Sequence, residues 1–192
     1  PAPDTSYHFV ATANLDTPPS QPFPLKGEGW GGGKLRPVIV GFGPAGIFAA
    51  LILAQSGFKP IVLERGKEVR ERTKDTWGLW RKSKLNAESN VQFGEGGAGT
   101  FSDGKLYSQI KDPKHYGRKV IKEFVIAGAP EEIQYVSHPH IGTFKLVGMV
   151  EKMRQTITEL GGEIRFEKRV DDIVIEDGEV KGVTLQTGEH LE

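Results

Sequence analysis

The chain contains no cysteine among its 192 residues. This absence excludes thiol nucleophiles, redox-active disulfides, iron–sulfur clusters and cysteine-bound zinc as properties of the chain. It also excludes a disulfide scaffold, which fits a reducing compartment, and we expect a cytoplasmic protein.

The chain also lacks an excess of charge and a long apolar run. Its 25 Lys+Arg balance 25 Asp+Glu, so the formal net charge is +0. Because nucleic-acid and anionic-membrane surfaces attract strongly basic proteins, we expect neither as a partner. No apolar stretch reaches the roughly 18 residues of a transmembrane helix, and no basic-then-apolar N-terminal segment suggests export.

Glycine, in contrast, is abundant, at 25 of 192 residues, about twice the usual share. Glycine destabilises regular structure unless the backbone needs its freedom. Residues 1–34 hold six prolines and five glycines without periodicity, which is typical of a tail or linker from an upstream region. We expect the folded part to span residues 35–190, and Leu191-Glu192 is consistent with a cloning scar.

The apolar pattern predicts a βαβ unit at the start of the folded part. Residues 38–40 and 61–63 are short apolar runs that predict two buried strands. Residues 45–56 lie between them and are apolar on nearly every face, which predicts a buried helix. Two strands joined in this way are parallel, with a right-handed crossover.

Three further helices are expected. Residues 67–85 predict one of them, with Trp77 and Trp80 as its apolar anchors. Asp112, followed by proline, predicts the N-cap of the second, and Thr143 that of the third.

The C-terminal part predicts strands. Residues 164–166 predict one strand, and residues 169–176 and 179–187 predict a hairpin that turns at Asp177-Gly178. The fold class is therefore α/β: a Rossmann-like fold with a parallel sheet and a β-hairpin layer.

Residues 41–46 read GFGPAG and fit the pattern G-x-G-x-x-G between a strand and a helix. The first glycine permits the tight turn, the second leaves room for a pyrophosphate, and the third lets the helix pack closely. The free N–H groups at the helix start can then bind the phosphates. The predicted cofactor-binding residues here are Gly41, Phe42, Gly43, Pro44, Ala45 and Gly46.

Glu64 stands 18 residues beyond Gly46, at the tip of the second strand. A carboxylate there can accept hydrogen bonds from the adenosine ribose. The alternatives are a structural turn without a ligand and an ordinary exposed strand-end carboxylate. The agreement of strand, glycines, helix and acid favours a dinucleotide site.

The same G-x-G-x-x-G pattern occurs in FAD-binding and in NAD-binding domains. The chain continues after Glu64 with Arg65-Gly66, a helix and a second glycine-rich stretch at residues 94–104, where a simple NAD domain more often continues with regular βα repeats. This order favours FAD, and the NAD(P)-binding domain of a dehydrogenase is the alternative.

Two segments resemble known families. Residues 38–66, VIVGFGPAGIFAALILAQSGFKPIVLERG, resemble the N-terminal FAD site of the glutathione-reductase-like two-domain flavoproteins. The strings ESNVQFGEGGAGTFSDGKL and PHIGT resemble more narrowly the bacterial family called FAD-dependent dehydrogenases. The resemblance covers about residues 36–188.

The resemblance implies FAD as the cofactor of an oxidoreductase, with NAD(P)H as an electron donor in the full-length protein. The AMP half of FAD would lie on residues 41–46 and Glu64, with Arg65 beside the adenosine and the backbone of Val170 at the adenine. A second loop and Lys105 would follow the pyrophosphate, the ribityl chain or the flavin. The predicted residues of that loop are Gly96, Gly97, Ala98, Gly99 and Thr100.

The family pattern also continues beyond the hairpin. Relatives add a substrate domain and a second FAD-contacting segment, so we expect the chain to be an N-terminal fragment whose partner is the missing C-terminal part. A fragment that holds nucleotide without turnover is the second alternative.

The other candidate residues also have interpretations that involve no ligand. Residues 94–104 could form a flexible surface loop, and Asp103 and Lys105 a solvated ion pair. His138 and His140 could bind a metal or donate a proton, but no third ligand is evident and surface histidines are the leading interpretation. We expect no metal site and assign no catalytic side chain.

Overall fold

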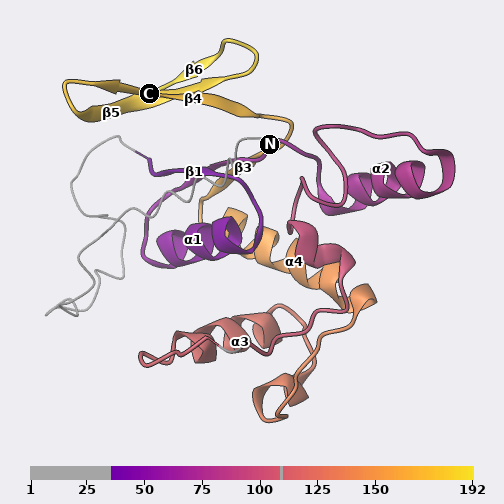
Figure 1. The fold of residues 1–192 in the computed structure, drawn as a ribbon. Helices are drawn as coiled ribbons and strands as arrows, with labels where there is room; N and C mark the ends of the chain where they lie inside the picture. The colour runs from indigo at the N-terminus through magenta and orange to yellow at the C-terminus, as the bar shows by residue number, and fades with distance from the viewer. Residues whose placement is uncertain (1–35, 109) are drawn as a thin grey trace, which may run out of the picture.

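The computed structural model describes residues 36–108 and 110–192, and the predicted tail at residues 1–34 lies outside the described residues. The fold has three layers. A parallel sheet lies between helices on one face and a small antiparallel sheet on the other (Figure 1). The α/β class with a parallel sheet and a hairpin layer, predicted from the sequence, is confirmed.

The parallel sheet contains β1 (Val38–Val40), β2 (Ile61–Leu63) and β3 (Glu163–Arg165), in the order β1-β2-β3. Both pairs of neighbours are parallel, with Val38 opposite Ile61 and Ile61 opposite Glu163. Helix α1 (Pro44–Gln55) joins β1 to β2 and completes the predicted βαβ unit. The carboxyl ends of β1 and β2 therefore meet at one edge.

The main core lies where α1 packs against α4 (Thr143–Glu159), beneath the parallel sheet in Figure 1. Leu51 of α1 and Ile157 of α4 are both fully buried there. The buried face of α4, formed by Leu146, Met149, Val150, Met153 and Ile157, is thus core. Its N-terminus differs from the prediction: Gly142 is the N-cap, while the hydroxyl of Thr143 donates to the carbonyl of Ser102 at 2.9 Å.

Helix α3 (Tyr116–Ile126) begins later than the sequence predicts. Asp112 is not its N-cap, because His115, in a left-handed conformation with φ of 57°, takes that position directly before Tyr116. The carboxylate of Asp112 instead reaches forward and accepts hydrogen bonds from the N–H groups of Tyr116 (3.0 Å) and Gly117 (2.7 Å).

Helix α2 (Val69–Lys82) lies to one side of the sheet. The prediction that Trp77 and Trp80 anchor it is wrong, since their relative exposures are 44% and 60%. Its buried residues are Val69, Arg72 and Thr76. The packed face of the helix therefore combines one apolar residue, Val69, with the buried guanidinium of Arg72.

The antiparallel sheet contains β4 (Val170–Glu176), β5 (Glu179–Leu185) and β6 (His190–Leu191). The predicted hairpin between β4 and β5 is confirmed, with positive φ at Asp177 and Gly178. A second apolar cluster, built on Leu63, Val183 and Leu185, joins this layer to the parallel sheet. Val170, at the start of β4, consequently lies near the end of β2.

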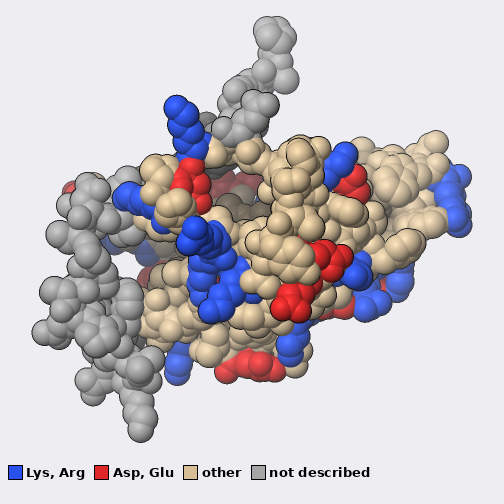
Figure 2. Space-filling view, turned by 90° about the horizontal axis from the view of Figure 1, so that it is seen from below, with Lys and Arg blue, Asp and Glu red and all other residues tan. Residues whose placement is uncertain are grey.

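No helix in the part of the chain that the structure describes is long and apolar enough to cross a membrane. On the face drawn in Figure 2, acidic and basic side chains are interspersed among uncharged residues. Two short 3-10 helices, η1 (Ala98–Phe101) and η2 (Glu131–Gln134), complete the fold.

Candidate dinucleotide site

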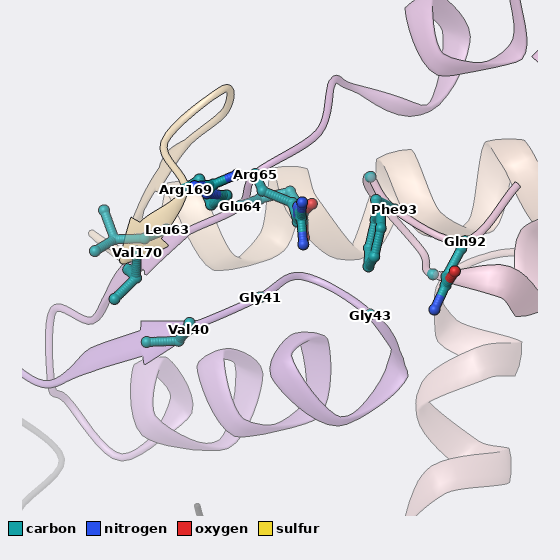
Figure 3. Close-up of a pocket in the computed structure, with 12 residues that line it drawn as sticks. Val40, Gly41, Gly43, Leu63, Glu64, Arg65, Gln92, Phe93, Arg169 and Val170 are labelled. Carbon is teal, nitrogen blue, oxygen red and sulfur yellow. The ribbon is translucent and has the colours of Figure 1, made fainter. Parts of the chain in front are cut away.

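A cavity of about 560 Å³ opens at the carboxyl ends of β1 and β2. In Figure 3 the chain from Val40 to Gly43 lies along one side, Glu64 and Arg65 lie on the opposite side, and Phe93 stands at one end. Ligands of open α/β sheets bind at this edge. The cavity is lined by Val40, Gly41, Gly43, Leu63, Glu64, Arg65, Gln92, Phe93, Gly94, Gly97, Arg169 and Val170.

The first glycine loop forms the turn that the sequence predicts. Gly41 has a φ of 91°, a conformation that favours glycine, and its N–H donates to the carbonyl of Leu63 at 2.8 Å. A Cβ on Gly46 would lie 2.0 Å from the carbonyl oxygen of Gly41, so only glycine allows α1 to approach this closely. Gly43 is the N-cap of α1, and among the described residues no side chain caps that terminus. The N–H groups of the first helical turn are thus free of side-chain caps and suited to an anion.

The second glycine loop packs directly against the first. The N–H of Gly96 donates to the carbonyl of Phe42 at 2.8 Å. A Cβ on Gly97 would lie 3.2 Å from the Cα of Gly43 and 3.0 Å from the Cδ of Pro44. The structure therefore brings together the two glycine clusters that the sequence singled out. Residues 94–96 and Thr100 are buried, so the stretch is not an exposed surface loop throughout.

Arg72 of α2 holds the second loop in place. Its fully buried guanidinium donates hydrogen bonds to the carbonyls of Asn90 (2.7 Å), Val91 (2.6 Å) and Glu95 (2.7 Å). Burial lowers the pKa of Arg72 to about 10. Because this value is still well above 7, the guanidinium stays charged at neutral pH. A Cβ on Gly94 would lie 2.4 Å from the Cδ of Arg72, so the arginine requires glycine at that position.

Glu95 ties the same loop to two helices. Its carboxylate is fully buried, accepts a hydrogen bond from the N–H of Val69 at 2.7 Å and forms a 2.9 Å ion pair with Arg154. Burial raises the pKa of Glu95, although the Val69 bond and Arg154 oppose this effect. The loop thus contacts α2 and α4 through one carboxylate.

Glu64 is buried at 4% relative exposure, so it is not an ordinary exposed strand-end carboxylate. One oxygen accepts from the N–H of Phe42 at 2.7 Å and the other from the N–H of Gly66 at 2.8 Å. It therefore helps to shape the first glycine loop and also lines the cavity. Each carboxylate oxygen has a second lone pair, so further donors can still bind.

Two arginines border the cavity near Glu64, and one carboxylate bridges them. Glu88 pairs with Arg65 at 2.8 Å and with Arg169 at 3.0 Å. The hydrogen bond from Arg65 is the main cause of the lowered pKa of Glu88. Arg65 also stacks over the ring of Phe93, 3.9 Å from its centroid, and Arg169 pairs with Asp171 at 2.9 Å.

Some predicted residues line the cavity and others do not. Those in the lining are Gly41, Gly43, Glu64, Arg65, Gly97 and Val170. Those outside it are Phe42, Pro44, Ala45, Gly46, Gly96, Ala98, Gly99, Thr100 and Lys105. The lining residues that sequence reasoning missed are Val40, Leu63, Gln92, Phe93, Gly94 and Arg169. Val40 and Leu63 end the two predicted strands, a signal that could have identified them.

The remaining candidates lie on the surface. Lys105 pairs with Asp103 at 3.3 Å, and both side chains are more than half exposed. His140 forms an isolated antiparallel bridge with Lys105, and His138 meets the ring of Tyr107 edge-on at 5.0 Å. Among the described residues, no group of three or more His, Cys, Asp or Glu side chains could hold a metal ion.

The fold and this cavity define a class: α/β proteins with a glycine-rich βαβ turn and a second glycine-rich loop against it. No protein-family model matches the chain. It is 53% identical over 152 residues to an uncharacterized protein of Clostridium beijerinckii. The matched region covers 79% of this chain and 28% of that protein. The chain therefore spans little more than a quarter of the length of this curated relative.

Solved structures of low sequence identity are also similar. A 3-ketosteroid-delta4-(5alpha)-dehydrogenase from Rhodococcus jostii is 16% identical, with 80% of this chain and 42% of that chain covered and a TM-score of 0.49. The THI4 protein of Thermovibrio ammonificans is 18% identical, with 79% and 47% covered and a TM-score of 0.48. An FAD-bound form of OTEMO is 18% identical, with 82% and 24% covered and a TM-score of 0.44.

Proposed function

We propose that the chain is the FAD-binding portion of a flavin-dependent oxidoreductase, in which a dehydrogenase reaction is completed by further parts of a longer protein. One observation carries this proposal: two glycine-rich loops are joined by the Gly96–Phe42 hydrogen bond, and both loops contribute lining residues to the cavity that Glu64 also lines. A nucleotide site needs backbone N–H groups that a ligand can approach closely, together with an acceptor for the ribose.

The residues present fit the adenosine and pyrophosphate parts of such a cofactor. The uncapped N-terminus of α1 would bind phosphate oxygens, and Gly43 leaves space there because no Cβ projects from it. Glu64 would accept from the ribose hydroxyls. Arg65 and Val170 lie in the same lining and would border the adenosine.

When bound, the flavin ring would supply the hydride or electron transfer, and this chain would supply placement and electrostatics. Gly97 and the following η1 segment would lie along the remainder of the cofactor. NAD(P)H is our proposed electron donor in the longer protein. We assign no catalytic side chain, and we expect the chain to show no turnover alone.

The experiment is a spectrum followed by titrations. We expect the purified chain either to carry flavin absorbance or to take up added FAD, measured by quenching of flavin fluorescence. FAD should bind more tightly than NAD in parallel calorimetric titrations. A colourless protein that binds NAD and not FAD would instead support the NAD(P)-domain alternative.

A further inference from the structure

The bridge from Glu88 to Arg65 and Arg169 has a chemical consequence for nucleotide choice. In dinucleotide sites of this fold, a carboxylate after the second strand accepts from an unmodified ribose, whereas a nearby arginine accommodates a 2′-phosphate. This chain has both side chains in sequence, because Arg65 directly follows Glu64 and both line the cavity. The guanidinium of Arg65, however, is already paired with the carboxylate of Glu88.

The position of Glu88 is built by its surroundings. Its N–H donates to the side-chain oxygen of Asn86 at 3.1 Å, which forms a local turn. A Cβ on Gly66 would lie only 2.8 Å from the carbonyl oxygen of Glu88, so the two backbones are in close contact. The backbone of residue 88 is thus held against the end of β2, and its carboxylate meets two arginines from distant segments.

There is room for a phosphate beside this bridge. A second cavity, of about 220 Å³, shares Arg65 and Arg169 with the first and is also lined by Glu88 and Lys67. Arg169 has Asp171 as another partner, and Lys67 has Asp75 at 3.0 Å. Arg65 is therefore the cation that loss of the Glu88 carboxylate would release most completely.

We propose that Glu88 is a specificity-determining residue: by occupying Arg65 and Arg169, it makes the adenosine end of the site reject nucleotides that carry a 2′-phosphate. This inference rests on the proposed function. Glu64 lines the first cavity and Glu88 and Glu167 line the second, so three carboxylates oppose a dianionic phosphate in the native chain. Removing the charge of Glu88 leaves Arg65 as a donor that a phosphate can use.

The test compares two ligands that differ only in the 2′-phosphate, AMP and adenosine 2′,5′-bisphosphate, by calorimetric titration of the full chain. The native chain should bind AMP more tightly than the bisphosphate. Glu88→Gln should narrow that preference by about tenfold, because a hydrogen bond to a charged group contributes about that factor. Glu71→Gln, which removes the exposed partner of Lys74, is the matched control and should leave the preference unchanged.

Further variants separate the possible results. Adding Arg65→Gln to Glu88→Gln should cancel the gain, and adenosine 3′,5′-bisphosphate should show a smaller gain than the 2′,5′ isomer. An equal gain for both isomers, or a gain that survives without Arg65, would overturn the assignment. Arg65→Gln in the native background should change the preference little, and a strong loss of bisphosphate binding would also overturn it.

The outcome distinguishes this inference from the proposed function. If AMP binds and Glu88→Gln folds with an unchanged preference, the role of Glu88 is wrong while the nucleotide site stands. If neither AMP nor the bisphosphate binds the native chain or the variant, the nucleotide site and the role of Glu88 are both refuted. Thermal unfolding of each variant establishes that the chain is folded during the titration.

Discussion

The N–H of Gly96 donates a 2.8 Å hydrogen bond to the carbonyl oxygen of Phe42, and this contact joins two glycine-rich loops from distant parts of the sequence. Since neither partner is a side chain, the contact depends on the conformations of both loops. Gly96 has a φ of 84°, and a Cβ there would lie 2.0 Å from the hydroxyl oxygen of Thr100. The shape of the cavity wall therefore depends on the conformation of the second loop as much as on that of the first glycine loop.

We expect Gly43→Ala to weaken FAD binding by at least about tenfold without unfolding the chain. Within the part of the chain that the structure describes, a Cβ at residue 43 would meet only the Cα of Gly97, at an ordinary 3.8 Å, so the fold has space for it. The same methyl group would occupy the approach that a pyrophosphate needs and displace its hydrogen bonds, which are worth about a factor of ten each. Fluorescence titration with FAD measures the loss.

The matched control for this variant is Gly148→Ala. Gly148 lies in α4, where a Cβ would have no atom of the described residues within 4 Å. Alanine there should raise the free energy of unfolding by about 0.5–1 kcal/mol and leave FAD binding unchanged. Native-like binding by Gly43→Ala would contradict the role of the fingerprint in holding phosphate.

Arg72→Met should destabilise the chain on the order of 3–5 kcal/mol, as expected when buried acceptors lose a charged donor. Methionine keeps much of the apolar stem but leaves the carbonyls of Asn90, Val91 and Glu95 without this partner. Urea unfolding followed by circular dichroism measures the effect. Arg81→Met is the control: it removes an exposed guanidinium stacked 4.0 Å from the Trp77 ring centroid, worth about 1 kcal/mol or less. Equal losses in both variants would refute the role assigned to Arg72.

The βαβ unit could be predicted from the sequence because its signals are local. Apolar runs identify β1 and β2, and the glycines between them identify the turn. The hairpin is equally local, since Asp177-Gly178 supplies both residues with positive φ. These elements depend on neighbours in sequence rather than on distant contacts.

Arg72, Glu88 and Arg169 could not be identified as site residues in the same way. Their roles arise from partners far away in sequence, such as the pairing of Glu88 with Arg169 at 3.0 Å. A charged residue on an amphipathic helix predicts solvent exposure, whereas Arg72 is fully buried among backbone carbonyls. Tertiary hydrogen bonds override that pattern, and no periodicity reports them.

Glu88 should contribute to stability in a pH-dependent way. Its arginine partners lower its pKa below the ordinary value of 4.5, so the folded state holds a proton less tightly than the unfolded state. The resulting stability is present above pH 4.5 and is lost as the pH falls through the folded pKa. The difference in free energy of unfolding between the native chain and Glu88→Gln should therefore shrink as the pH is lowered from 7 toward 3 in urea titrations. Because Glu88 is partly exposed, we expect high salt to reduce this difference, and a difference that grows on acidification would be inconsistent with the ion pairs.

Glu95 should show the opposite sign. Burial raises its pKa above 4.5, so the folded state binds a proton more tightly than the unfolded state. The native chain should then gain stability relative to Glu95→Gln as the pH falls from above the folded pKa to below 4.5. The Gln variant is the appropriate reference because its amide oxygen can still accept from the N–H of Val69 and its side chain does not titrate. Paired urea titrations between pH 8 and pH 4 measure the trend. A relative loss of stability over that range would mean that Arg154 outweighs desolvation and that the carboxylate of Glu95 is preferentially ionised in the folded state.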